Sequence, residues 1–138
     1  MITNNVPLNV SDKAATPVVH VFTPSGRISA DNVVNWLDMW HNNGLPIGFE
    51  SIDYSVKQPK AAGSPWRVKV TMARPIVDFT IATAPKLQGT MRFSGEFIFP
   101  EAASLQNRKD LVEMVKNLFA QDQASLLGDN IAQMTLPY

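Results

Sequence analysis

The clearest structural signal in the chain lies at residues 50–57, which run Glu-Ser-Ile-Asp-Tyr-Ser-Val-Lys. Apolar and polar side chains alternate there, and a period of two is typical of a strand with one buried face. The alternation resumes at residues 66–72, after a loop rich in Pro, Gly and Ala at residues 58–65. The two segments predict an antiparallel hairpin with a long tip. A third alternating strand is predicted at residues 91–99.

Toward the N-terminus the signals are weaker. Residues 1–17 are polar and broken by prolines, which indicates a loose arm or an edge strand. Residues 18–22 are β-branched and aromatic, and they predict a strand that stops at the turn formed by residues 23–26. Residues 32–41 have apolar side chains at spacings of three and four, so this segment is either a short helix or a strand followed by a loop. Residues 74–89 predict an extended loop flanked by short strand ends.

Helices are expected only near the C-terminus. Pro100 ends the last strand, and Ser104 is a suitable N-cap for a helix that runs to about Phe119, although the helix could equally start nearer Asn107. A shorter apolar segment, residues 126–134, predicts a second helix. Strands followed by helices indicate the α+β class, with an antiparallel sheet and the helices on one side of it.

Composition limits the possible functions. The chain has 138 residues, which fits a single domain spanning residues 1–138, and its 12 basic and 12 acidic side chains give a net charge of zero. It has no cysteine, and no stretch is typical of a secretion signal or a membrane span, so we expect a soluble, unprocessed protein without disulfides. Its two histidines, His20 and His41, lack metal-ligand spacing and an accompanying nucleophile. We therefore expect no catalytic residue, no metal and no cofactor.

Positive charge is concentrated in the strand region, because residues 51–95 carry an excess of +5. The polar positions of the alternating strands should emerge on one face of the sheet. Cations and hydroxyls on one face suit the phosphates and unstacked bases of RNA, although an ordinary solvated strand face has a similar composition. The candidate RNA-binding residues are Ser51, Asp53, Ser55, Lys57, Arg67, Lys69, Thr71, Arg92 and Ser94.

The opposite strand positions, such as Tyr54, Trp66 and Phe93, form a wide apolar face that needs a cover. An intertwined homodimer, with each chain's helices over the partner's sheet, would supply one. The alternative is that the N-terminal strands and residues 32–41 complete the cover within one chain. Trp36 and Trp40 are expected to be core anchors, and His41 is expected to make a surface contact with Asp38.

The order of these elements resembles the coat proteins of the small single-stranded RNA bacteriophages, the leviviruses. The resemblance extends from about Val18 to the C-terminus, and it lies in the order and spacing of several short pieces. They are Val33-Val34-Asn35-Trp36, Tyr54-Ser55-Val56-Lys57-Gln58-Pro59, Trp66-Arg67-Val68-Lys69-Val70, Ser94-Gly95-Glu96-Phe97-Ile98-Phe99-Pro100, Leu126-Leu127-Gly128-Asp129-Asn130-Ile131-Ala132-Gln133-Met134 and Pro137-Tyr138.

The resemblance implies an N-terminal hairpin, a five-stranded antiparallel sheet and two C-terminal helices that interlock with a second subunit. It also implies a T=3 icosahedral shell around genomic RNA, assembled in the bacterial host cytoplasm. The inner face of the sheet would bind an RNA hairpin, and this binding would repress replicase translation. The nine candidate residues match the hairpin-facing positions, except that Asp53 stands where the family commonly has a hydroxyl and Arg92 where it often has an aromatic residue.

Two other functions remain open at this point. One is a dimeric RNA-binding regulator that never assembles. The other is a small enzyme using His41 and Asp38, which the missing nucleophile and metal ligands disfavour.

Overall fold

The structure of the protein is a computed structural model that describes residues 6–28 and 33–136, without the side chains of residues 26–28. It consists of two compact units, residues 1–98 and residues 99–138, and each is described here by itself. No helix in the described ranges is long and apolar enough to cross a membrane.

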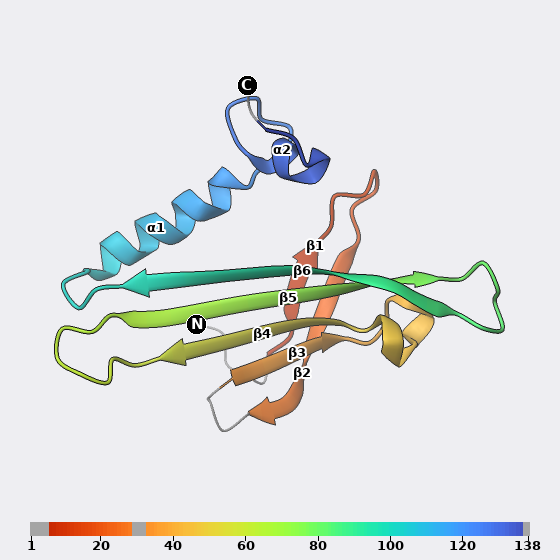
Figure 1. Ribbon diagram of the computed structural model, residues 1–138, viewed down its shortest axis with the longest axis horizontal. Coiled ribbons are helices and arrows are strands. Elements are labelled where there is room, and N and C mark those ends of the chain that lie inside the picture. Colours follow the sequence, from red (N-terminus) through yellow and green to blue (C-terminus); the bar gives the residue numbers. More distant parts are fainter. Residues whose placement is uncertain (1–5, 29–32, 137–138) are drawn as a thin grey trace. The chain divides into compact units, whose positions relative to one another are not determined.

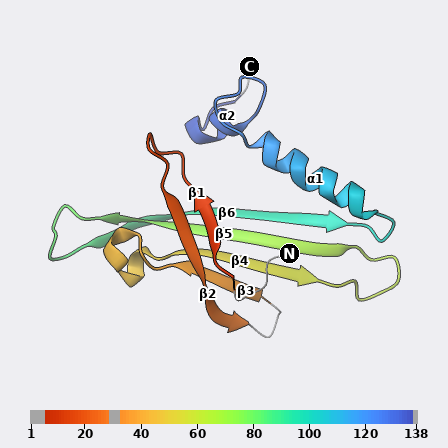
Figure 2. The same ribbon diagram turned by 180° about the vertical axis from the view of Figure 1, so that it is seen from behind.

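The first unit is built on an antiparallel sheet in which the strands follow chain order, β1-β2-β3-β4-β5-β6 (Figure 1). Strand β2 has two partners, because its first residues pair with β1 and its later residues pair with β3. The expected N-terminal hairpin is therefore present and joins the rest of the sheet through β2 (Figure 2). Within the described residues the sheet has six strands in all, one more than the expected five. The strands are β1 (Leu8–Ser11), β2 (Val19–Ile28), β3 (Val33–Asp38), β4 (Glu50–Lys57), β5 (Trp66–Asp78) and β6 (Lys86–Phe99).

Strand β2 continues past the turn that was predicted to end it. The hydroxyl of Thr23 donates to the carbonyl oxygen of Leu37 at 3.2 Å, and the hydroxyl of Ser25 donates to that of Asn35 at 3.2 Å. Pro24 lies between them opposite Trp36, and the register shifts after it. The predicted stop at residues 23–26 is wrong, because this part of β2 pairs only with β3 and tolerates a proline.

Residues 33–38 form a strand, so the helical alternative for residues 32–41 is wrong. Two short 3-10 turns, η1 (Asn42–Gly44) and η2 (Pro46–Gly48), follow β3. The predicted loop at residues 74–89 is also too long, because β5 and β6 leave only residues 79–85 between them. The pairing of β5 with β4 ends at Ala73, so Pro75 removes no hydrogen-bond donor from the ladder between these two strands.

The second unit contains the two predicted helices, α1 (Leu105–Leu118) and α2 (Gly128–Gln133). The Ser104 hydroxyl oxygen accepts a hydrogen bond from the backbone N–H of Asn107 at 3.1 Å, which confirms the predicted N-cap. Helix α2 is shorter than residues 126–134. A side chain at position 128 would collide with the carbonyl of Ala120, so Gly128 allows the chain to pass closely there.

The core of the first unit joins the hairpin to the sheet. Phe22 of β2 is fully buried against Trp36 and Ile52, which are cross-strand partners on β3 and β4. The indole N–H of Trp36 donates to the carbonyl oxygen of Val6 at 3.1 Å. Trp36 is therefore the expected core anchor, whereas Trp40 is 76% exposed and that prediction is wrong.

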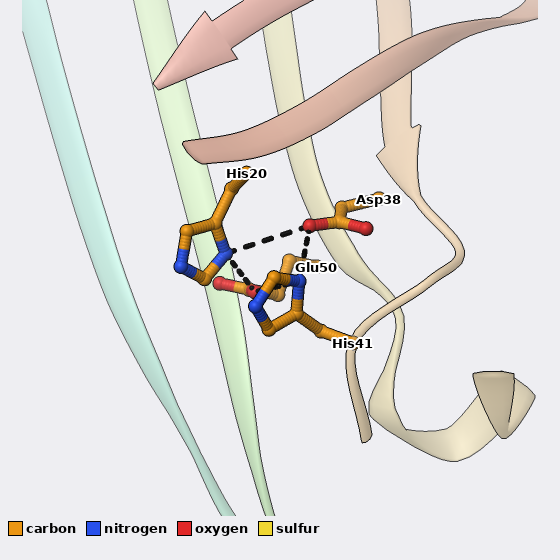
Figure 3. Close-up of side chains that lie close together, drawn as sticks. All are labelled: His20, Asp38, His41 and Glu50. Atoms are coloured by element: carbon orange, nitrogen blue, oxygen red, sulfur yellow. Dashed lines mark hydrogen bonds and ion pairs between the residues drawn. The ribbon is translucent and has the colours of Figure 1, made fainter. Parts of the chain in front are cut away.

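A buried polar cluster of His20, Asp38, His41 and Glu50 lies in the same unit (Figure 3). His20 Nδ1 lies 2.7 Å from Glu50 Oε1, and His41 Nδ1 lies 2.7 Å from Asp38 Oδ2. The two imidazole rings stack with centroids 3.7 Å apart. Burial lowers the pKa of His20, but its hydrogen bonds to the carboxylates of Asp12 and Glu50 outweigh that effect, so the pKa is raised. The expected contact between His41 and Asp38 exists, but Asp38 is fully buried, so its predicted position at the surface is wrong.

Candidate nucleic-acid interface

The candidate residues of β4 and β5 lie on one face of the sheet, which we call the polar face. In the antiparallel register Asp53 lies opposite Thr71, Ser55 opposite Lys69, and Lys57 opposite Arg67, while Ser51 lies opposite Ala73. Directly opposed residues in a ladder point to the same side. The predicted strand parity is therefore confirmed for all seven candidates on these two strands.

An ion pair between β5 and β6 places the candidate residues of β6 on the polar face. Arg67 Nη1 donates to Glu96 Oε1 at 2.7 Å, which puts the Glu96 side chain on the same side as Arg67. Arg92 and Ser94 share the parity of Glu96, and both are exposed. On the other parity, a side chain at Gly95 would run into the ring of Phe93, so that ring covers Gly95 on the opposite face.

A polar row crosses the middle of the polar face. Asn35 Nδ2 donates to Asp53 Oδ1 at 2.5 Å, and the Thr71 hydroxyl donates to Asp53 Oδ2 at 3.5 Å. These three residues are neighbours on β3, β4 and β5. Asn35 was not among the candidates, because the sequence left residues 32–41 open between a helix and a strand. The signal for Asn35 is its place as a polar residue between the apolar residues Val34 and Trp36.

The charges on the polar face are unevenly paired. Lys57, Lys69 and Arg92 are exposed, and no described acidic residue forms an ion pair with them. The guanidinium of Arg67 forms an ion pair with the carboxylate of Glu96, and both side chains are partly exposed. Ser55 is buried, whereas the other candidates are half-buried or exposed.

Arg74 makes no contribution to the polar face. Its Nε lies 3.0 Å from Glu50 Oε2, in the buried polar cluster. The positive excess of residues 51–95 is therefore only partly available on the polar face. The exposed cations Lys57, Lys69 and Arg92 remain there, which is enough to attract an anionic ligand.

The other face of the sheet is apolar and incompletely covered. Tyr54 lies opposite Val70, and Val56 lies opposite Val68. Ile52 is buried, but Tyr54, Trp66 and Phe93 are 38%, 39% and 47% exposed. The N-terminal strands and residues 33–41 therefore cover only the Ile52 end, and the alternative of a complete cover from these segments is wrong.

Comparison with known proteins identifies the family. The family model for "Levivirus coat protein" matches residues 3–138. The chain belongs to the levivirus coat protein family. Coat proteins are structural components of the virion, so this coat protein is a capsid-forming protein located in the capsid.

Solved structures share the fold of this coat protein. The virus-like particle of bacteriophage ESE058 matches with a TM-score of 0.82 at 24% identity, over 97% of this chain and 99% of that chain. The virus-like particle of bacteriophage NT-214 matches with a TM-score of 0.77 at 23% identity, over 96% and 97% of the two chains. The bacteriophage GA capsid protein matches with a TM-score of 0.74 at 12% identity, over 97% and 98%. No curated protein sequence matches the chain significantly.

Proposed function

We propose that this coat protein forms an interlocked homodimer, that the dimers assemble into an icosahedral shell around single-stranded RNA, and that the polar face binds the genomic RNA, including a hairpin operator that controls replicase translation. The observation that carries the RNA part of the proposal is the register of β4 and β5, which aligns Lys57 with Arg67 and Ser55 with Lys69 on one side of the sheet.

The dimer is supported by apolar surface on each unit taken separately. In the first unit Tyr54, Trp66 and Phe93 remain exposed on the apolar face. In the second unit α1 has no buried residue, and the exposed side chains of Leu111, Val112 and Leu118 lie along it at helical spacing. Apolar patches of this kind mark interfaces. A second copy of the chain offers a matching apolar surface for both units.

RNA binding is supported by the chemistry of the polar face. Lysine and arginine side chains neutralise phosphates, hydroxyls donate to phosphate and base edges, and an arginine stacks on an unpaired base. Arg92 occupies a position where that stacking is available, since it is exposed on β6. A sheet with one basic face and one apolar face can bind RNA on one side and a protein partner on the other.

Assembly is tested by expressing the full chain and examining it by size-exclusion chromatography and electron microscopy, with absorbance at 260 and 280 nm. Regular shells that absorb strongly at 260 nm are expected. Discrete dimers at all salt and RNA concentrations would contradict the shell and favour a non-assembling regulator. Monomers would contradict the interlocked dimer.

The RNA site is tested with the double variant Lys57→Ala/Lys69→Ala. Because two phosphate contacts are lost, packaged RNA per shell should fall, and the slope of log affinity against log salt should shrink by about 1.4 for single-stranded RNA. Lys109→Ala, which removes an exposed cation of α1, is the matched control. An equal loss of RNA in both variants would remove the polar face from the RNA site.

A further inference from the structure

The buried polar cluster has the donor atoms and spacing of a metal site. His20 Nδ1 lies 2.7 Å from Glu50 Oε1 and 3.4 Å from Asp38 Oδ2. His41 Nδ1 lies 2.7 Å from Asp38 Oδ2 and 3.8 Å from Glu50 Oε1. Ligand atoms around tetrahedral zinc stand about 3.3 Å apart, given bonds of about 2.0 Å. The four separations bracket that value, and all four candidate atoms lie within 4.8 Å of one another, so side-chain adjustment would be needed to bring them onto one ion.

Three of the four candidate ligands are held by a second contact. His20 Nε2 lies 2.9 Å from Asp12 Oδ2, so a proton on Nε2 would be donated to Asp12, and Nδ1 would bind the metal in place of its present contact with Glu50. Glu50 Oε2 is held by Arg74 Nε at 3.0 Å, and Asp38 Oδ1 accepts the backbone N–H of Trp40 at 3.0 Å. Metal-binding histidines commonly donate their other ring N–H to a carboxylate in this way. The cluster therefore has an outer layer of contacts that orients its inner atoms.

The charge of the cluster favours a divalent cation. Asp12, Asp38 and Glu50 contribute three carboxylates, and Arg74 contacts Glu50. These three carboxylates and Arg74 together carry a formal charge of about −2, which a divalent ion bound by neutral imidazoles would cancel.

The geometry points to a binding site for a zinc-like divalent transition metal formed by His20, Asp38, His41 and Glu50. Imidazole and carboxylate ligands are the donor set that Zn²⁺ accepts. His20 comes from the hairpin strand β2, whereas the other three come from the end of β3, the turn after it and the start of β4. The metal would therefore fasten the N-terminal hairpin to the sheet.

The site is tested by metal content and by unfolding. The full-length protein is loaded with Zn²⁺, dialysed against metal-free buffer at pH 7.5 and analysed for bound zinc. We expect one zinc per chain. Free Zn²⁺ at 100 times its dissociation constant should raise the folding equilibrium constant about 100-fold, and a chelator should reverse the rise. Protein that is folded but retains no zinc, with a thermal midpoint unaffected by zinc or chelator, would overturn the site.

Two variants locate the metal. His41→Gln removes a half-buried ligand, so the fold should persist while bound zinc is lost. Asp12→Asn keeps the oxygen that accepts the N–H groups of Ala14 and Val18. Its new amide group would donate a hydrogen bond to His20 Nε2, so the ring proton would move to Nδ1, the atom that is proposed to bind the metal. Zinc affinity should then fall at least about 10-fold.

Asp110→Asn, an exposed change on α1, is the matched control and should keep one zinc per chain. Equal zinc content in His41→Gln and the wild type would place the metal elsewhere and overturn the proposal. The visible absorption of bound Co²⁺ indicates the coordination geometry of the metal, because a tetrahedral site gives intense bands that an octahedral surface site does not. This inference is independent of RNA binding and shell assembly, because zinc content is measured on any folded form.

Discussion

Arg67 and Glu96 form an ion pair between β5 and β6, with Nη1 and Oε1 2.7 Å apart. The pair lies on the polar face, next to Lys57, which is the cross-strand partner of Arg67. If the polar face binds RNA as proposed, Glu96 therefore competes with phosphate for the guanidinium of Arg67. An exposed ion pair of this kind contributes little to folding, so its effect on RNA binding should exceed its effect on stability.

Glu96→Gln should strengthen RNA binding. The change removes one negative charge and releases Arg67, so the slope of log affinity against log salt should steepen by about 0.7 for single-stranded RNA. The free energy of unfolding should change by less than about 1 kcal/mol. Fluorescence anisotropy with labelled RNA at several salt concentrations measures the slope. Glu113→Gln, in the α1 pair with Lys116, is the control, and equal slopes in both variants would contradict a role for Arg67.

Phe22→Ala should detach the N-terminal hairpin from the sheet. Phe22 is fully buried against Trp36 and Ile52, and truncating such a ring costs about 3–5 kcal/mol. Urea unfolding at fixed protein concentration measures the loss. Val19→Ala, on the same strand but half exposed, should cost much less. Similar costs for the two variants would show that the hairpin does not depend on this core.

Ser104→Ala should destabilise α1. The serine oxygen accepts the Asn107 N–H, and loss of an N-cap costs about 1 kcal/mol. Helical circular dichroism during thermal unfolding measures the change. Ser104→Asp, which keeps an acceptor at the cap, should unfold like the wild type, and a defect of equal size in both variants would argue against the cap.

Asp78 should stabilise the turn between β5 and β6 in a pH-dependent way. The hydroxyl and backbone N–H of Thr80 both donate to its carboxylate, and they hold the pKa of Asp78 below its usual value. A lowered pKa means that this stabilisation is complete above the unfolded-state pKa of about 3.9 and is lost as pH falls through the folded-state pKa. Wild type and Asp78→Ala should therefore differ in urea midpoint at pH 7 and pH 5 and converge near pH 2. A constant difference across that range would contradict the assignment.

The strands with strict alternation could be predicted from the sequence alone. Residues 50–57 form β4 with the predicted bounds, because apolar and polar residues alternate along the segment. The same logic placed Lys69 and Arg67 on one face. It failed at Pro24, because side-chain hydroxyls on either side hold the strand to its neighbour, and such contacts have no periodicity.

The polar cluster could not be predicted because its members are scattered along the chain. His20 and Glu50 are 30 residues apart, and only the pairing of β2, β3 and β4 brings them together. Glu96 lies at a polar position of the predicted strand 91–99, but its pairing with Arg67, 29 residues away in sequence, depends on the register between β5 and β6. Tertiary contacts of this kind carry no local signal.

The order of strands in the sheet has a consequence for how the chain folds during synthesis. Each strand pairs with the strands immediately before and after it in the chain, so no pairing must wait for a distant segment. Loop-closure entropy stays small when neighbours pair in sequence. The ribosome could therefore release this sheet as a growing meander, in which each new strand covers the unpaired edge of the strand before it. A protein needed in many copies at once gains from a short time spent with open edges.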